Sequence, residues 1–287
     1  MPVFFLNFEG NCSGIHELEI VAKNREWIFL GSIIVELKNH MAVVTINRPD
    51  ALNAFNYETL SELQDSIEKL RTNPEVRVVI FTGAGERAFS VGADLKERKT
   101  LSEVEVRRNI YKIGEVFSLI DQLPQPTIAA INGFAFGGGM ELALSCDFRI
   151  AVSNTKMGLT ETSLAIIPGA GGTQRLPRLI GQAKALELIL TAKRLSAEEA
   201  LAYGLVTKLA DSENLLDTCF ELAEQMLANG PLALQQAKFA VKQGMNVDLQ
   251  TGLQIERKAY EVIIPTEDRL EALQAFAEKR KPEFKGK

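Results

Sequence analysis

The sequence contains only two histidines, His16 and His40, among 287 residues. Histidine is the commonest metal ligand and the usual base beside a nucleophilic serine. A histidine-based metal site or a Ser-His-Asp triad is therefore not expected, and we expect no bound metal. Acid–base chemistry in this chain would rest mainly on carboxylates, lysine or tyrosine.

Cysteine is also scarce. Cys12, Cys146 and Cys219 lie far apart and are odd in number, which favours neither a disulfide framework nor a zinc knuckle. A reducing, cytoplasmic location is the natural inference. No stretch approaches the roughly 20 apolar residues of a membrane span, so we expect no membrane partner.

Positive charge is in the minority. The 37 acidic residues outnumber the 32 basic ones, which gives a net charge of −5. A negative balance argues against a nucleic-acid partner. The 46% hydrophobic and 24% charged composition is that of a soluble globular protein, and the length allows one large domain or two small ones.

Strand and helix patterns alternate over the first two thirds of the chain, and helices fill the rest. We expect strands at 33–39, 41–47, 76–82, 127–131 and 148–152. We expect helices at about 57–71, 103–123, 176–190, 196–203, 214–228, 231–244 and 266–280. This order predicts an α/β fold with a parallel-rich sheet and a helical tail.

Three regions follow from this pattern. Residues 1–31 show no clean period and are interpreted as an N-terminal extension of unknown role. Residues 32–210 are expected to form the core that holds the active site, and residues 211–287 a helical C-terminal region.

The most informative stretch is residues 127–147, which read TIAAINGFAFGGGMELALSCD. They predict a buried strand, a glycine turn and a helix with Glu141 in its first turn. A helix N-terminus presents unpaired N–H groups, and glycine lets another molecule approach them. Such a site can hold an oxygen that becomes anionic during a reaction. The alternative is a helix start with packing glycines and a glutamate that favours the helix dipole.

Three other segments contain glycines that could border a ligand. Gly83–Ala88 nearly matches the dinucleotide fingerprint, but no amphipathic helix follows, so a nicotinamide site is not expected. The loop at 168–175 lacks the Gly-Lys-Ser/Thr ending of a phosphate-binding loop; it approaches a ligand or allows a sharp turn. Gly92-Ala93-Asp94 exposes a backbone N–H or forms a plain turn.

Glu141 and Glu161 each lie near a glycine-rich loop. Two carboxylates that share a pocket raise at least one pKa, which suits acid–base chemistry near neutral pH. The alternative is two unrelated, solvated glutamates.

Four motifs carry a resemblance to a known family. They are INRPDALNA at 46–54, FSVGADLKE at 89–97, AAINGFAFGGGMELALSCD at 129–147 and TETSLAIIPGAGGTQRLPR at 160–178. In order and spacing they resemble the enoyl-CoA hydratase/isomerase (crotonase) family, from about residue 33 to the C-terminus.

The resemblance implies an α/β, crotonase-like spiral of repeated ββα units with a helical C-terminal trimerisation region. It implies an acyl-CoA substrate, a homotrimer or dimer of trimers, and no cofactor, because coenzyme A is part of the substrate. It also implies an oxyanion hole formed by the N–H groups of Ala93 and Gly138. Of the two catalytic glutamates, Glu141 would activate water and Glu161 would protonate C2.

The resemblance also implies which residues bind the coenzyme A body. The residues implied to bind it are Ala51, Leu52, Asp94, Leu95, Lys96, Phe276 and Lys279. The last two fall on the C-terminal helix, which in this family sometimes reaches a neighbouring subunit. Their alternative reading is a core phenylalanine and a solvated lysine.

The implied activity is enoyl-CoA hydration, because both glutamates are present. Several segments look most like the methylglutaconyl-CoA hydratase branch, which acts in leucine degradation and whose substrate carries an extra carboxylate. The sequence does not identify the group that would bind that carboxylate. The alternatives are a double-bond isomerase on the same scaffold and a non-catalytic RNA-binding or assembly protein. The acidic character of helix 57–71 argues against RNA binding.

Overall fold

The computed structural model describes residues 19–22 and 25–287. The expected N-terminal extension over residues 1–31 lies partly outside the described residues, because residues 1–18, 23 and 24 are not among them. The strands are β1 (Glu19–Ala22), β2 (Arg25–Leu30), β3 (Ile33–Lys38), β4 (Met41–Ile46), β5 (Val78–Gly83), β6 (Ala88–Ser90), β7 (Thr127–Ile131), β8 (Phe134–Phe136), β9 (Phe148–Val152), β10 (Lys156–Gly158), β11 (Leu195–Ser196) and β12 (Lys208–Ala210).

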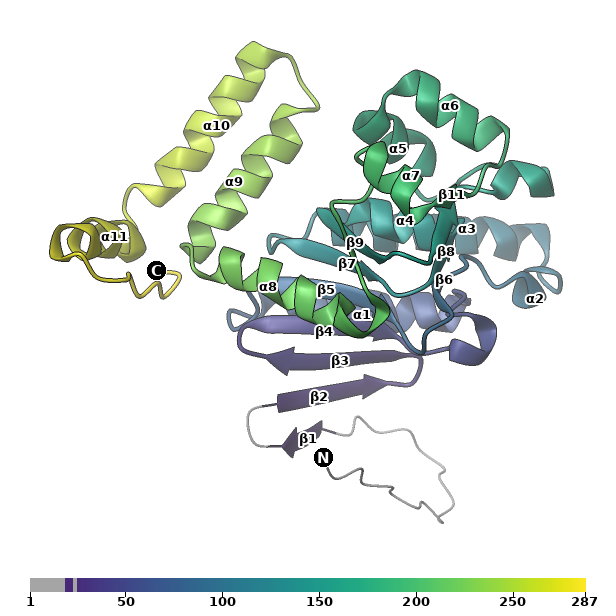
Figure 1. The fold of residues 1–287 in the computed structure, drawn as a ribbon, viewed down its shortest axis with the longest axis horizontal. Helices are drawn as coiled ribbons and strands as arrows, with labels where there is room; N and C mark the ends of the chain where they lie inside the picture. The colour runs from purple at the N-terminus through teal and green to yellow at the C-terminus, as the bar shows by residue number, and fades with distance from the viewer. Residues whose placement is uncertain (1–18, 23–24) are drawn as a thin grey trace.

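The helices cover the sheets and form the C-terminal region (Figure 1). They are α1 (Tyr57–Thr72), α2 (Leu95–Arg98), α3 (Glu103–Asp121), α4 (Gly138–Ser145), α5 (Gly172–Ile180), α6 (Gln182–Leu190), α7 (Ala197–Ala202), α8 (Leu215–Leu227), α9 (Pro231–Gly244), α10 (Leu249–Ile263) and α11 (Glu267–Glu278). Short 3₁₀ helices are η1 (Pro49–Ala51), η2 (Glu161–Leu164) and η3 (Ser212–Asn214).

The larger sheet has the strand order β1-β2-β3-β4-β5-β7-β9-β12. Its first four strands are antiparallel, and the strands from β4 onward are parallel. The predicted hairpin at 33–47 is confirmed, and its turn residues Asn39 and His40 both have positive φ. The smaller sheet has the order β11-β10-β8-β6.

Successive units of two strands and a helix repeat along the chain. In β5-β6-α3, β7-β8-α4 and β9-β10-α5, the first strand joins the larger sheet and the second joins the smaller one. The predicted spiral of ββα units is therefore confirmed. Gly83–Ala88 links β5 directly to β6 without a helix.

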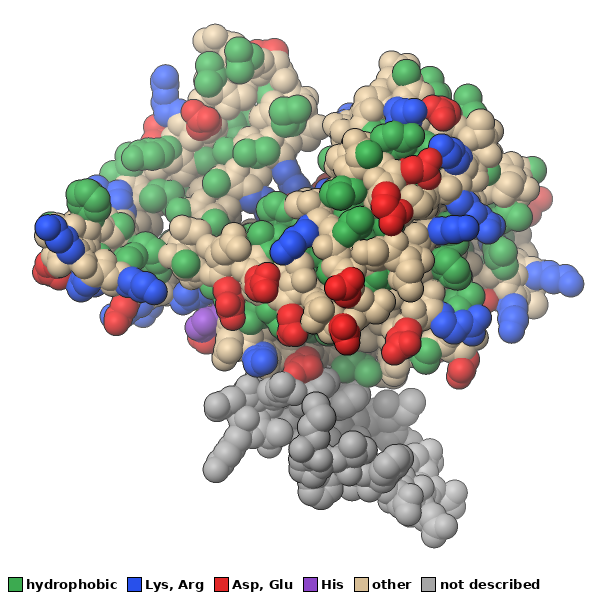
Figure 2. Space-filling model, viewed as in Figure 1, with side chains coloured by type: hydrophobic (Ala, Val, Ile, Leu, Met, Phe, Trp, Pro, Cys, Tyr) green, Lys and Arg blue, Asp and Glu red, His purple; other side chains and the backbone are tan. Residues whose placement is uncertain are grey.

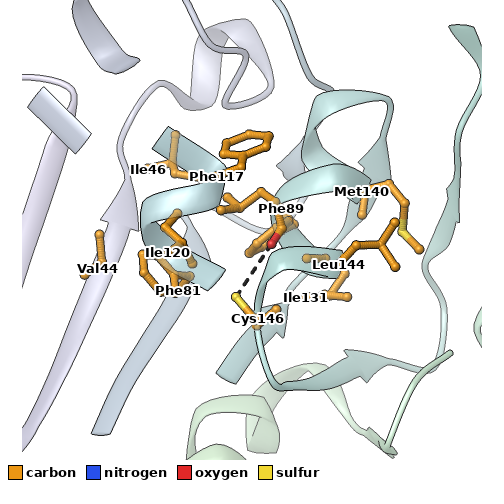
Figure 3. Close-up of a cluster of buried hydrophobic side chains, with 14 of the residues drawn as sticks. Val44, Ile46, Phe81, Phe89, Phe117, Ile120, Ile131, Met140, Leu144 and Cys146 are labelled. Carbon is orange, nitrogen blue, oxygen red and sulfur yellow. Dashed lines mark hydrogen bonds between the residues drawn. The ribbon is translucent and has the colours of Figure 1, made fainter. Parts of the chain in front are cut away.

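Strand alternation divides the core between the two faces of the larger sheet. One set of side chains, including Val44 and Phe81, packs under α1, α3 and α4 (Figure 3). The alternate set, including Val43 and Ile80, packs against α8. Cys146 closes the first core, where its Sγ donates to the Leu142 carbonyl at 3.6 Å.

One helix prediction was wrong, and one helix was missed. The helix expected at 176–190 is two helices, α5 and α6, because Gly181 between them has φ +80°. Helix α5 also begins earlier, at Gly172 inside the glycine-rich loop. Helix α10 was not predicted; it contains Gly252, which lies against Gly244 of α9 without breaking the helix.

Helix α9 is joined to the core by a buried ion-pair cluster. Lys238 Nζ lies 2.6 Å and Lys242 Nζ 2.7 Å from the Asp147 carboxylate, which follows α4. Burial acts to raise the pKa of Asp147, but the two ammonium groups hold it below its ordinary value. Beyond this anchor, α9, α10 and α11 extend away from the body that carries the sheets (Figure 1).

Candidate active site

The smaller sheet brings three loops together. β6, β8 and β10 are parallel neighbours, so their carboxyl ends share one edge. The segment after β6 carries Ala93, the segment after β8 carries Gly138 and Glu141, and the segment after β10 carries Glu161. These four predicted site residues, which span 68 positions in sequence, thus gather at this edge.

Two backbone N–H groups are left free of the secondary structure there. Ala93 forms an isolated parallel bridge with Phe55, which uses the carbonyl of Gly92 and the N–H of Asp94. In such a bridge the N–H of Ala93 itself points to the opposite side. Gly138 is the first residue of α4, so its N–H has no intrahelical acceptor. Both groups can donate to a ligand oxygen.

Glycine is required where these loops touch. A Cβ on Gly92 would lie 2.6 Å from the Gly138 N, and a Cβ on Gly139 would lie 2.0 Å from the Ser90 carbonyl oxygen. Gly92 also has φ +89°. The glycines therefore allow the Ala93 and Gly138 segments to approach each other closely.

The Glu141 carboxylate is buried and held by the loop at 168–175. Its Oε1 accepts hydrogen bonds from the N–H groups of Ala170, at 2.8 Å, and Gly172, at 2.9 Å. Burial raises the pKa of Glu141, while these two donors act in the opposite direction by stabilising the carboxylate. The loop that the sequence left open as a ligand contact or a sharp turn thus binds a glutamate.

The Glu161 carboxylate lies in a different environment. It begins η2, and a Cβ on Gly137 would lie 3.3 Å from its Oε1, which places it against the start of α4. Its Oε2 is buried without a hydrogen-bond partner in the described part of the chain. Burial, followed by the charge of Glu141, raises the pKa of Glu161 to about 7. The two glutamates are therefore close enough to interact.

This raised pKa predicts a pH-dependent effect on stability. The folded protein retains a proton on Glu161 up to about pH 7, whereas an ordinary glutamate releases it near pH 4.5. The free energy of unfolding therefore falls as pH rises through this interval. Glu161→Gln removes the ionisation, so we expect it to be more stabilising at pH 8 than at pH 5, by about 1–2 kcal/mol after solvent screening.

Urea unfolding at the two pH values measures this difference. The control is Glu115→Gln, because Glu115 is exposed on α3. A stabilisation by Glu161→Gln that is equal at both pH values, or that matches the control, would contradict the assigned ionisation.

The segments expected to hold coenzyme A lie beside the free N–H of Ala93. Ala51 ends η1, and the Leu52 carbonyl accepts from Val91 N at 3.2 Å, so both are tied to the segment before Ala93. Leu95 and Lys96 are exposed on the first turn of α2. Their role in binding coenzyme A stays a prediction.

Asp94 has a structural role that the sequence did not indicate. Its side chain caps α2 by accepting from the N–H groups of Lys96 and Glu97, and it pairs with Arg48 at 3.0 Å. Burial opposes these contacts, but the hydrogen bond from Arg48 and the two N–H groups hold the pKa of Asp94 below its ordinary value. Its carboxylate is thus already engaged.

Phe276 and Lys279 do not join this group within one chain. They lie on and just after α11, at the opposite end of the molecule from α2 (Figure 1). Phe276 is 87% exposed, so it is not the core residue of the alternative reading. Any contact with the site described here would have to come from another copy of the chain.

A partly open cleft borders Ala93 and runs between α2 and α3. Sequence reasoning missed most of its lining. The residues concerned are Phe55, Leu60, Glu97, Arg98, Leu101, Val106, Asn109, Ile110 and Ile113. The apolar spacing of 103–123 indicated a core face, but not that part of this face would border a cleft.

Within residues 19–22 and 25–287, no group of three or more histidine, cysteine, aspartate or glutamate side chains could hold a metal ion. In the same ranges, no helix is long and apolar enough to cross a membrane.

Comparison with known proteins assigns the family. The profile of the enoyl-CoA hydratase/isomerase family matches residues 36–287. The chain belongs to this family. The short-chain-enoyl-CoA hydratase of Clostridium acetobutylicum is 46% identical over 254 residues, which are 88% of this chain and 97% of that protein. The human mitochondrial methylglutaconyl-CoA hydratase is 47% identical over 250 residues, which are 86% and 74% of the two chains.

The fold of this chain agrees with that of a solved structure. The crystal structure of an enoyl-CoA hydratase from Bacillus anthracis superposes with a TM-score of 0.88 at 51% identity and covers 89% of this chain and 100% of that one. The resemblance inferred from the four motifs, and the hydratase/isomerase scaffold that it implied, are therefore confirmed.

Proposed function

We propose that this protein is an enoyl-CoA hydratase, which adds water reversibly across the C2=C3 bond of a 2-enoyl-CoA thioester. The observation that supports this most is the pairing of two free N–H groups with two buried carboxylates in unlike environments. One glutamate has backbone donors that favour its ionised form, and the other has an unpartnered oxygen and a pKa near 7.

The proposed steps follow from this geometry. The thioester carbonyl oxygen accepts from the N–H groups of Ala93 and Gly138. Glu141, ionised, takes a proton from water as the water oxygen bonds to C3, and negative charge moves onto the thioester oxygen. Glu161, protonated, then gives its proton to C2. No redox step occurs, so no redox cofactor is required.

Hydration of crotonyl-CoA tests the proposal. We expect the absorbance of the conjugated enoyl thioester to fall on addition of the purified protein, with formation of 3-hydroxybutyryl-CoA. A displaced double bond, or solvent exchange at carbon without a hydrated product, would support an isomerase instead.

For the acyl group we propose 3-methylglutaconyl-CoA, an intermediate of leucine degradation. The human relative carries that substrate in its name, whereas the Clostridium acetobutylicum relative is named for short-chain enoyl-CoA. Parallel assays of crotonyl-CoA and 3-methylglutaconyl-CoA decide between them. A cytoplasmic location stays a prediction that cell fractionation tests.

The RNA-binding alternative has little support. Helix α1 carries Glu58, Glu62, Asp65 and Glu68 against Lys69 and Arg71. The Glu62 carboxylate also accepts from the N–H and hydroxyl of Ser32, so it serves the fold. An acidic helix repels phosphates.

We further propose that the chain forms a homotrimer or a dimer of trimers through its C-terminal helices. These helices expose many large apolar side chains, and part of this surface is seen in Figure 2. They are Phe239, Val241, Met245, Leu249, Leu253, Tyr260, Val262, Leu270, Leu273 and Phe276. Exposed apolar surface of this extent is typical of subunit interfaces.

Sedimentation equilibrium tests the assembly. We expect a mass of three or six times 31.6 kDa. Replacing Leu253 by glutamate in this apolar surface should shift the mass toward the monomer, whereas replacing the exposed Glu115 by glutamine should not. A monomeric wild-type chain at micromolar concentration would contradict the proposal.

A further inference from the structure

The cleft beside Ala93 has mainly apolar walls. Besides Ala93, six of its lining side chains are hydrophobic, and they come from α1, α3 and the segments next to them. They are Phe55, Leu60, Leu101, Val106, Ile110 and Ile113. Because Ala93, whose N–H is proposed to hold the thioester oxygen, also lines the cleft, the acyl chain of a bound substrate would lie next to it. Such walls suit the carbon skeleton of a short acyl group.

One charge in the cleft is not compensated. Arg98, the last residue of α2, is the only cationic side chain among the described residues that line it. Its guanidinium makes no hydrogen bond or ion pair within the described part of the chain, although it is only partly exposed. Arginine presents a planar set of donors that matches a carboxylate in two parallel hydrogen bonds.

The nearby carboxylates have other partners. Asp94 pairs with Arg48 and caps α2. The Glu97 carboxylate accepts from Tyr57 N at 3.2 Å and from Asn109 Nδ2 at 3.3 Å. The two acidic groups that line the cleft are therefore held by other donors, and the Arg98 guanidinium remains available to an anion.

We infer that Arg98 determines acyl specificity by binding a terminal carboxylate on the acyl chain, so that the preferred substrates are short dicarboxylic 2-enoyl-CoA thioesters. This inference rests on the proposed hydratase function and deepens it, because it names the side chain that recognises the far end of the substrate. The apolar walls contact the carbon skeleton, and the guanidinium pairs with the carboxylate at its end. A monocarboxylic substrate such as crotonyl-CoA leaves Arg98 without a partner.

A matched pair of substrates tests this role. Glutaconyl-CoA is crotonyl-CoA with a carboxylate added at the end of the chain, so the ratio of their kcat/KM values isolates that group. Arg98→Met is expected to lower kcat/KM for glutaconyl-CoA by about 10- to 100-fold and to change that for crotonyl-CoA by less than about 3-fold. Arg98→Lys, which keeps the charge but not the planar donors, should give an intermediate ratio for glutaconyl-CoA.

Lys99→Met is the control, since Lys99 is an exposed cation next to Arg98 that does not line the cleft. It should leave kcat/KM unchanged for both substrates.

An equal loss of kcat/KM for both substrates in Arg98→Met would assign Arg98 to coenzyme A or to the fold and overturn the inference. Two further outcomes would overturn the inference and leave the hydratase function intact. In the first, the wild-type enzyme hydrates crotonyl-CoA but not glutaconyl-CoA. In the second, it hydrates both, and Arg98→Met does not change kcat/KM for glutaconyl-CoA. Failure to hydrate either thioester would overturn both.

Discussion

Replacement of either Glu141 or Glu161 by glutamine is expected to lower kcat for the hydration of crotonyl-CoA by about 10²–10⁴-fold, the usual contribution of a positioned general acid or base. Glutamine keeps the size of each side chain but cannot exchange a proton. At position 141 the amide oxygen can still accept from Ala170 and Gly172, so the loop that these donors belong to should stay in place. The loss should therefore appear in kcat rather than in the fold.

The two substitutions are not expected to be additive. Both glutamates act in one proton-transfer sequence, so the double variant should be only slightly slower than the worse single variant. Glu115→Gln, on an exposed face of α3, serves as the matched control and should be fully active. A loss of less than about 10-fold for either active-site variant would show that its carboxylate does not move a proton in the rate-limiting step.

Ala93→Pro is expected to lower kcat by about 10²–10³-fold, because it removes one of the two donors to the developing oxyanion. Proline lacks an N–H, but the bridge to Phe55 uses the Gly92 carbonyl and the Asp94 N–H, so that pairing can persist. The Gly138 N–H remains and accounts for the residual activity.

Ala93→Val separates the lost donor from the added bulk. Valine adds a similar volume beyond Cβ while keeping the N–H, and we expect it to retain activity within about 10-fold. Circular dichroism and thermal unfolding check that both variants fold. Equal losses in the two variants would mean that crowding of the cleft, rather than loss of a hydrogen bond, explains the effect.

Much of the fold could be predicted from local patterns. The hairpin of β3 and β4, helix α1 and the buried strands were expected because their apolar periodicity is strong and their ends carry clear turn residues. The errors occurred where glycine had two possible meanings. Gly181 breaks a helix that looked continuous, while Gly252 lies inside α10 and does not break it.

The residues of the candidate site could be proposed from the sequence, but their geometry could not. Motif resemblance named Ala93, Gly138, Glu141 and Glu161, yet only the parallel order of β6, β8 and β10 brings their segments together. That order depends on long-range pairing, which periodicity does not encode. For the same reason the sequence could not show that the loop at 168–175 holds Glu141.

Arg98 illustrates the same limit. In sequence it is one of several charged residues after Asp94, and the motif resemblance points to Lys96 rather than to Arg98. The structure distinguishes it because α2 directs it to the cleft between α2 and α3 while its acidic neighbours are held by other donors. Such a role depends on which charges are already paired, and pairing is a property of the folded chain.

In the proposed mechanism, the two glutamates add the elements of water across C2=C3. The most direct measurement is mass spectrometry of the product formed from crotonyl-CoA, in parallel reactions in H₂¹⁸O and in D₂O. We expect a 3-hydroxyacyl thioester with one ¹⁸O at C3 from the first solvent and one deuterium at C2 from the second, formed about 10²–10⁴-fold more slowly by Glu141→Gln and by Glu161→Gln. A product without ¹⁸O whose double bond has moved, or a labelled product that both glutamine variants form at the wild-type rate, would contradict this mechanism.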